Sequence, residues 1–223
     1  MSLVEFQKKP VYPVVYMFVV MLFFTAILVG LARSAADRVE ANNQIRFERA
    51  VLLAVGVEAE SMNPAEVHAA FVENIQPPTP ASAGAYTYPG ERRASAASSS
   101  SAVPAVYAIP FEGQGFWNVI KGVVGIKPDG KTVTGIAFYE QSETPGLGAE
   151  IVKPPFRDQF RELTLAEGPA LLRLKPAGSD ADEPGVDAIS GATQTCTRLE
   201  RILNDALKEW RSEMVRHHQW RWR

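Results

Sequence analysis

An uncharged run near the start of the chain, residues 10–32, constrains the fold more than any other feature. A helix needs about 20 predominantly apolar residues to cross a bilayer core, whereas the apolar part of a secretory signal spans only about 7–15. The run therefore predicts a retained transmembrane helix at residues 10–32, preceded by a tail at residues 1–9. A cleaved signal is the alternative, because residues 34–36 are small. A buried helix of a soluble protein fits less well, since apolar side chains cover every face of the run.

The flanking charges leave the orientation of this helix open. Two lysines precede the run and four arginines follow it: Lys8, Lys9, Arg33, Arg38, Arg46 and Arg49. The positive-inside rule therefore does not favour export of the C-terminal bulk, but long domains translocate largely regardless of such charges.

The overall composition excludes several classes of protein. With 46% hydrophobic residues and a net charge of −2, the chain is neither fully disordered nor a globally basic nucleic-acid binder, so no nucleic-acid partner is expected. The single cysteine excludes an intramolecular disulfide and a four-cysteine metal site. Because only three histidines are present, no metal site is predicted.

The region after the run divides into a helical part and an irregular part. Residues 33–76 are predicted to be helical and membrane-proximal, with a first helix over residues 35–55. Asn63, Pro64 and Glu66 then form the sequence signature of a second, capped helix. Residues 77–104 are rich in Pro, Ala, Ser and Gly and have no apolar period, which predicts a mobile insertion or linker.

Residues 105–212 carry the predicted core of a single α+β domain. Residues 122–126 and 132–139 have the composition of two strands around a Pro-Asp-Gly turn. Six apolar residues then recur at helical spacing and predict one buried helix face: Leu199, Ile202, Leu203, Ala206, Leu207 and Trp210. These patterns predict a twisted sheet flanked by helices.

Two loops of this domain have compositions that suit a planar ligand with a phosphate. The first, ETPGLG at residues 143–148, combines a Pro-Gly turn with an apolar side chain, Leu147, between two glycines. The second, DAISGATQT at residues 187–195, leads into the amphipathic helix, where free N–H groups and the helix dipole favour an anion. Taken alone, the first loop is more typical of an ordinary turn, and the second is more typical of a helix cap formed by Ser190. The second loop is neither a P-loop nor a dinucleotide fingerprint.

Taken together with Gly-Phe-Trp at residues 115–117, the two loops resemble a known family of FMN-binding domains. This family occurs in the FMN-binding C subunit of sodium-translocating NADH:quinone reductases and in the G subunit of Rnf electron-transport complexes. The resemblance covers the membrane helix and roughly residues 111–210, and it is closer to the NADH:quinone reductase member. It implies an N-terminal transmembrane helix followed by one FMN-binding domain.

The resemblance also implies a covalent cofactor and names the residues that hold it. FMN would be joined by a phosphoester bond to Thr193, the last residue of the [ST]-G-A-T motif. A separate flavin transferase would form this bond from FAD with a divalent cation, and it would recognise the surrounding motif: Asp187, Ser190, Gly191, Ala192 and Thr193. Four residues of the first loop would line the flavin: Glu143, Thr144, Leu147 and Gly148.

Two neighbours of Thr193 carry alternative interpretations. Thr195 is a second candidate for the attachment site, because it is also a threonine near the start of the helix. Cys196 stands where serine is common in the family. It is either a small buried residue or a thiol that touches the flavin, with a pKa lowered by the helix N-terminus.

The function implied by the resemblance is that of an electron-transfer subunit in a multi-subunit, ion-translocating oxidoreductase. No catalytic residue is expected in the chain itself, and the flavin domain is expected on the periplasmic side of the bacterial inner membrane. The alternatives are a stand-alone membrane-tethered flavoprotein and a non-redox assembly subunit. The basic, aromatic tail at residues 213–223 is predicted to dock on a membrane or a partner, or to be a frayed extension.

Overall fold

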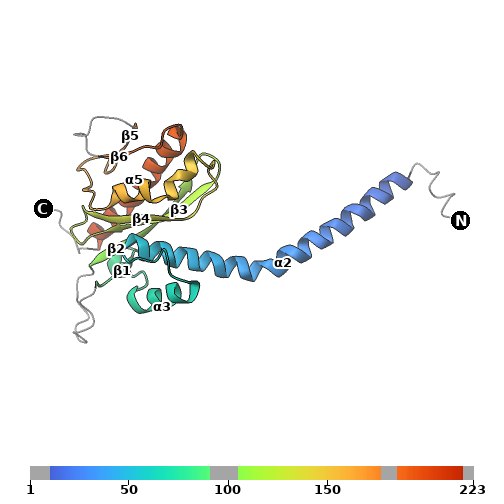
Figure 1. Ribbon diagram of the computed structural model, residues 1–223, viewed down its shortest axis with the longest axis horizontal. Helices are drawn as coiled ribbons and strands as arrows, with labels where there is room; N and C mark the ends of the chain where they lie inside the picture. The colour runs from blue at the N-terminus through green and yellow to red at the C-terminus, as the bar shows by residue number, and fades with distance from the viewer. Residues whose placement is uncertain (1–10, 91–104, 177–184, 218–223) are drawn as a thin grey trace. The chain divides into compact units, whose positions relative to one another are not determined.

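A computed structural model describes residues 11–90, 105–176 and 185–217 of the chain. The chain divides into two units, residues 1–44 and residues 45–223. Helix α2 (Tyr12–Ala54) begins in the first unit and ends in the second, and Figure 1 shows it in blue and cyan. The two predicted helical stretches, residues 10–32 and 35–55, therefore belong to one continuous helix. The reason is local, since no proline or glycine interrupts residues 31–55.

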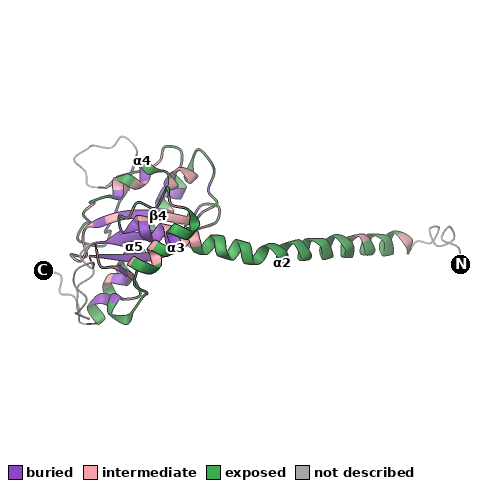
Figure 2. Cartoon of the chain, turned by 60° about the horizontal axis from the view of Figure 1, so that its bottom comes forward, coloured by how far each residue is buried: buried purple, intermediate pink, exposed green. Residues whose placement is uncertain are grey.

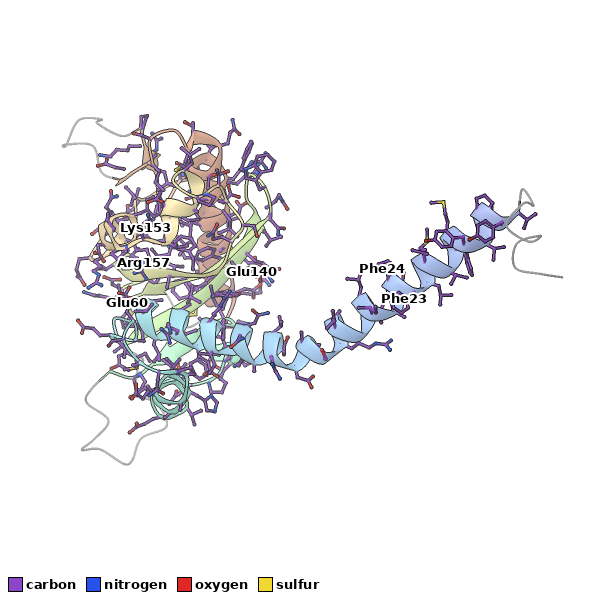
Figure 3. All side chains as sticks on the ribbon, turned by 45° about the vertical axis from the view of Figure 1, so that its right-hand side comes forward. Phe23, Phe24, Glu60, Glu140, Lys153 and Arg157 are labelled. Atoms are coloured by element: carbon purple, nitrogen blue, oxygen red, sulfur yellow. The ribbon has the colours of Figure 1, made fainter. Side chains whose placement is uncertain are left out.

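The described part of the first unit contains the apolar stretch of α2 and the polar residues that follow it up to Gln44. Its large side chains are exposed all round the helix, as Phe23 and Phe24 illustrate in Figure 3 and the colouring of Figure 2 shows for the whole segment. Among the described residues, α2 is the one helix that is long and apolar enough to cross a membrane. Apolar side chains on every face suit a lipid environment, because they need no polar neighbour.

The second unit begins with the end of α2 and a short capped helix, α3 (Pro64–Asn74). The predicted capping box is confirmed: Asn63 Oδ1 accepts hydrogen bonds from Ala65 and Glu66, and the Glu66 carboxylate accepts one from the Asn63 N–H. The loop between the two helices is tied to α4 (Pro154–Arg157) by an ion pair between Glu60 and Arg157, both labelled in Figure 3.

A four-stranded antiparallel sheet forms the centre of this unit, in the order β1–β2–β3–β4 (Figure 1). The strands are β1 (Tyr86–Tyr88), β2 (Val106–Gln114), β3 (Val119–Ile126) and β4 (Val133–Glu140). The β3–β4 hairpin confirms the two predicted strands and their turn, where Gly130 adopts a φ of 64°. The prediction that residues 77–104 lack regular structure is wrong for their first part, because a 3₁₀ turn η1 (Pro80–Ser82) and β1 lie there. Residues 91–104 lie outside the described part.

Both faces of the sheet are covered, as the α+β prediction requires. On one face, alternate residues of β2 pack into a cluster with α5 (Thr193–Arg216). On the other face, the intervening residues pack against the end of α2 and against α3. The predicted apolar face of α5 is confirmed: five of its six residues are buried, and Ala206 is partly buried. Successive strand residues point to opposite faces, which is why one strand serves both clusters.

The end of α2 approaches the sheet closely at two glycines that pair across β3 and β4, Gly125 and Gly135. A Cβ at Gly125 would overlap the carbonyl of Ala54, and the Thr134 hydroxyl donates a hydrogen bond to that carbonyl at 2.7 Å. The last carbonyls of a helix have no intrahelical partner, so this bond satisfies one of them.

The chain returns to α5 through short elements that carry the loops of interest. These are η3 (Gly148–Val152), α4, η4 (Asp158–Phe160), and a parallel pair of two-residue strands, β5 (Leu174–Lys175) and β6 (Val186–Asp187). Asn204 of α5 anchors the segment before β5, since its Oδ1 accepts from the N–H groups of Leu171 and Leu172 and its Nδ2 donates to the Leu172 carbonyl.

Candidate functional site

The start of α5 is an exposed helix N-terminus that no side chain caps. Thr193 is the first helical residue and is exposed, and the residue at the N-cap position is Ala192. The expected alternative, in which Ser190 caps the helix, is therefore wrong, because the helix begins three residues after Ser190. The first-turn N–H groups and the dipole of α5 remain available to an anion.

The two predicted loops meet at this helix end. Gly191 adopts a φ of 79°, and a Cβ there would lie 3.0 Å from Leu147 Cδ2. Glycine at position 191 thus allows both the backbone conformation and the close approach of the other loop. Leu147 is 41% exposed, so its side chain is available to a ligand beside Thr193.

A third segment, residues 115–117, adds exposed aromatic rings. Trp117 is 64% exposed, and its indole N–H donates a hydrogen bond to Thr144 Oγ1 at 2.9 Å. Phe116 packs edge-on against Trp117 with ring centroids 5.0 Å apart. Trp117 is not among the predicted site residues, although an aromatic pair after a glycine in the stretch that carries the resemblance is a usable signal. These rings extend an exposed apolar surface from the ETPGLG loop.

The four residues expected to line the flavin divide into two kinds. Thr144 and Leu147 are exposed, whereas Glu143 and Gly148 are buried. Glu143 is only 4% exposed and accepts hydrogen bonds from Thr195 and Trp117. The two buried residues thus lie beneath the loop surface that Thr144 and Leu147 form.

Thr193 is exposed, whereas the two neighbouring candidates, Thr195 and Cys196, are buried. The Thr195 hydroxyl is buried and donates to Glu143 Oε2 at 2.6 Å, so the alternative attachment site is not available. Cys196 is buried as well, and its Sγ accepts a hydrogen bond from the Ile189 N–H at 3.4 Å. Burial raises the pKa of the Cys196 thiol, so the expectation of a lowered pKa is wrong, while the interpretation as a small buried residue fits.

Asp187, the first residue of the second motif, is exposed at the end of β6. Its backbone N–H donates to Gln159 Oε1 at 2.7 Å, and its carboxylate lies 4.0 Å from the ammonium group of the buried Lys175. The described residues hold no group of three or more acidic, histidine or cysteine side chains arranged for a metal ion.

A cavity of about 350 Å³ lies elsewhere in the second unit, between the end of α2, β4 and α4. Leu53, Gly135 and Arg157 are among the residues that line it, and none of the motif residues does. The surroundings of Thr193 are instead an open surface with three properties: an uncapped helix N-terminus, an exposed hydroxyl and exposed apolar side chains. A flat aromatic ring system with a phosphate at one end fits these properties.

The comparison with protein families shows what this part of the chain is similar to. Residues 115–208 match the model of the FMN-binding domain. The match begins at the Gly-Phe-Trp segment and includes both loops and most of α5. Over these residues, which are less than half of the chain, the molecule is similar to the FMN-binding domain family.

Individual relatives are similar to part of the chain. The C subunit of the Na(+)-translocating NADH-quinone reductase from Neisseria meningitidis serogroup B is 50% identical over 90 residues, which are 39% of this chain and 34% of the relative. The corresponding protein from Pasteurella multocida is 40% identical over 104 residues, 46% of this chain and 38% of the relative. The aligned segments thus span only about a third of the relatives' length.

Two solved structures share the fold. The crystal structure of the C subunit of the Na(+)-translocating NADH-quinone reductase from Parabacteroides distasonis superposes with a TM-score of 0.61 at 22% identity, covering 79% of this chain and 95% of that one. NqrC from Shewanella oneidensis gives a TM-score of 0.59 at 21% identity and covers 79% and 99%. At these identities the two structures establish the fold.

Proposed function

We propose that this chain is a membrane-anchored electron-transfer subunit that carries FMN covalently on Thr193. The observation that carries the proposal is the exposed Thr193 hydroxyl at an uncapped helix N-terminus, beside exposed Leu147 and Trp117, within a matched FMN-binding domain. The complex would be an ion-translocating oxidoreductase of the NADH:quinone reductase or Rnf type, because the relatives are subunits of a Na(+)-translocating NADH-quinone reductase.

The attachment step follows from the position of Thr193. Its Oγ would attack the phosphorus on the flavin side of FAD, forming an O–P bond while the P–O–P bond breaks and AMP leaves with the bridging oxygen. The hydroxyl proton would pass to a base of the flavin transferase or to water. The transferase must reach Thr193 from solvent, and the exposure of Asp187, Ser190 and Thr193 supports this.

The chain would hold the attached group with three kinds of contact. The free N–H groups of the first turn of α5 would face the phosphate anion. Leu147 and Trp117 would provide apolar and aromatic surface for the ring, and the Trp117–Thr144 hydrogen bond fixes the indole for that purpose. When bound, FMN supplies reversible electron transfer, and the protein supplies its position and electrostatic environment.

The apolar part of α2 would serve as a single-pass anchor in the bacterial inner membrane, with the flavin domain on the periplasmic side. One helix cannot enclose an ion pathway, so ion translocation would belong to polytopic partner subunits. Electrons would enter and leave through neighbouring redox subunits. Co-purification of the full chain with such partners separates this role from that of a stand-alone tethered flavoprotein.

The attachment is tested by flavin fluorescence of the denatured protein band. The full chain is expressed with and without a flavin transferase, beside Thr193→Val and the control Thr197→Val, which changes an exposed threonine one turn further along α5. Fluorescence that survives denaturation is expected in the wild type and the control only when the transferase is present, and never in Thr193→Val. A non-fluorescent wild type would support the non-redox assembly role, and fluorescence in Thr193→Val would place the attachment at another residue.

A further inference from the structure

The carboxylate of Glu143 is buried at the junction of three segments. Its Oε2 accepts a hydrogen bond from Thr195 Oγ1 at 2.6 Å, and its Oε1 accepts one from the backbone N–H of Trp117 at 3.1 Å. Its own N–H donates to Gln141 Oε1 at 2.7 Å. Acidic side chains are rarely buried unless their oxygens are hydrogen-bonded, so these donors allow Glu143 to lie inside the fold.

Two glycines leave the space that this carboxylate occupies. A Cβ at Gly115 would lie 2.5 Å from Glu143 Oε1, and a Cβ at Gly148 would lie 2.5 Å from Thr195 Oγ1 and 3.0 Å from Glu143 Oε2. Real Cβ atoms do not approach so closely, and φ is not positive at either glycine. At position 148, glycine is therefore required by the Glu143–Thr195 pair rather than by backbone conformation, whereas a Cβ at Gly115 would also lie 2.7 Å from the Asn118 carbonyl oxygen and 2.8 Å from Ile120 Cδ1.

The Glu143–Thr195 pair also connects the segments that carry Trp117, Leu147 and Thr193, the residues proposed to contact FMN. Trp117 is bound through its backbone to Glu143 and through its indole to Thr144, the next residue of the loop. Thr195 stands in the first turn of α5, which Thr193 begins, and Leu147 belongs to the Glu143 loop. A buried network whose members are all hydrogen-bonded restricts its segments to one arrangement.

We propose that Glu143 is a positioning residue of the flavin site and that Thr195 is its partner. This inference rests on the proposed FMN function. The pair holds Trp117 and the ETPGLG loop against the first turn of α5, so that the receiving surface is formed before the flavin is attached. Such a preformed surface lowers the ordering cost of attachment.

Four variants of the full chain in detergent test whether the Glu143–Thr195 hydrogen bond positions the loops or is only a contact without that effect. Glu143→Ala removes both acceptors, whereas Glu143→Gln keeps the size and one carbonyl acceptor for the Trp117 N–H, while the Thr195 hydroxyl can turn to accept from the amide. Thr195→Val keeps the shape without the hydroxyl, and Thr195→Ser keeps the hydroxyl. The matched control is Glu150→Gln, because Glu150 lies in the following turn and pairs with Lys153 at 2.7 Å, apart from the network.

The first readout is hydrogen exchange of the flavin-free chain, which does not depend on the cofactor. In Glu143→Ala and Thr195→Val, peptides covering residues 115–118 and 143–149 are expected to exchange at least about tenfold faster, because buried donors lose their acceptor or the loop loses its anchor. Glu143→Gln, Thr195→Ser and the control should retain most of the protection. Peptides from β3 and the interior of α5 should not change in any variant.

The second readout is the initial rate of covalent flavin loading by a purified transferase with FAD and Mg²⁺. Glu143→Ala is expected to load about tenfold more slowly than wild type, with recovery in Glu143→Gln. Unchanged loop exchange in Glu143→Ala, or an equal loss of protection in β3, would overturn the positioning role. A wild-type chain that takes up no flavin would overturn the proposed function instead, so the two failures are distinguishable.

Discussion

Replacing Gly125 by alanine should destabilise the second unit, because the site has no room for a methyl group. The new Cβ would overlap the Ala54 carbonyl and the Thr134 hydroxyl, so the end of α2 must move away from the sheet. Overpacking of this kind costs about 1–3 kcal/mol, and loss of the Thr134–Ala54 hydrogen bond adds about 1 kcal/mol. For a unit of this size, the total of about 2–4 kcal/mol lowers Tm by roughly 5–15 °C.

The assay is thermal and urea unfolding of the full chain in detergent, followed by circular dichroism. Gly135→Ala is the matched control, because Gly135 pairs with Gly125 across the hairpin and its added Cβ would lie 3.3 Å from the Leu53 carbonyl oxygen. A neighbour at that distance needs to shift only slightly, so the control should lose less than about 1 kcal/mol. Equal stability of Gly125→Ala and wild type would refute the close contact between α2 and the sheet.

Three further outcomes are expected. Asn204→Ala should destabilise the second unit by about 3 kcal/mol, since two buried N–H groups and a carbonyl lose their partner; the urea midpoint of the variant tests this. Cys196 should resist iodoacetamide at about pH 8 in the folded chain and react once urea unfolds it, because burial raises its pKa; fast labelling of the native chain would contradict its burial. At Asp129, burial acts to raise the pKa, but hydrogen bonds from Thr132 and Lys131 outweigh it and lower the pKa below 3.8. Its stabilisation is therefore present above the unfolded-state pKa and lost as pH falls through the folded one, so the stability difference between wild type and Asp129→Asn should shrink between about pH 5 and pH 3.

Several elements could be predicted from sequence because their signals are local. The capping box at Asn63 and the turn at Asp129 involve residues no more than three apart, and the apolar face of α5 repeats within a few turns. The uncharged run of residues 10–32 needs only its length and composition. Signals of this kind act before any tertiary contact forms, so they can be recognised without the fold.

Other elements could not be predicted because their stability comes from distant partners. Strand β2 contains Pro110, which argues against a strand paired on both sides, and β1 pairs only with residues 106–108 of β2, so Pro110 has a strand partner in β3 alone. Strand β1 lies in a segment whose composition predicts disorder, and it forms because Tyr86, Thr87 and Tyr88 pair with β2. Short strands are only marginally stable alone, so the tertiary partner decides them.

The site shows the same division. The sequence by itself determined the chemical parts: an apolar helix, a threonine at the start of an amphipathic helix, and a loop with one leucine between two glycines. Only the tertiary structure decided that Glu143 is buried and bonded to Thr195, 52 residues away, and that Trp117 joins the surface from 26 residues before Glu143. The physical reason is that these hydrogen bonds and contacts join segments far apart in the sequence. They form only when the complete sheet and α5 place those segments side by side, and no local sequence pattern predicts that placement.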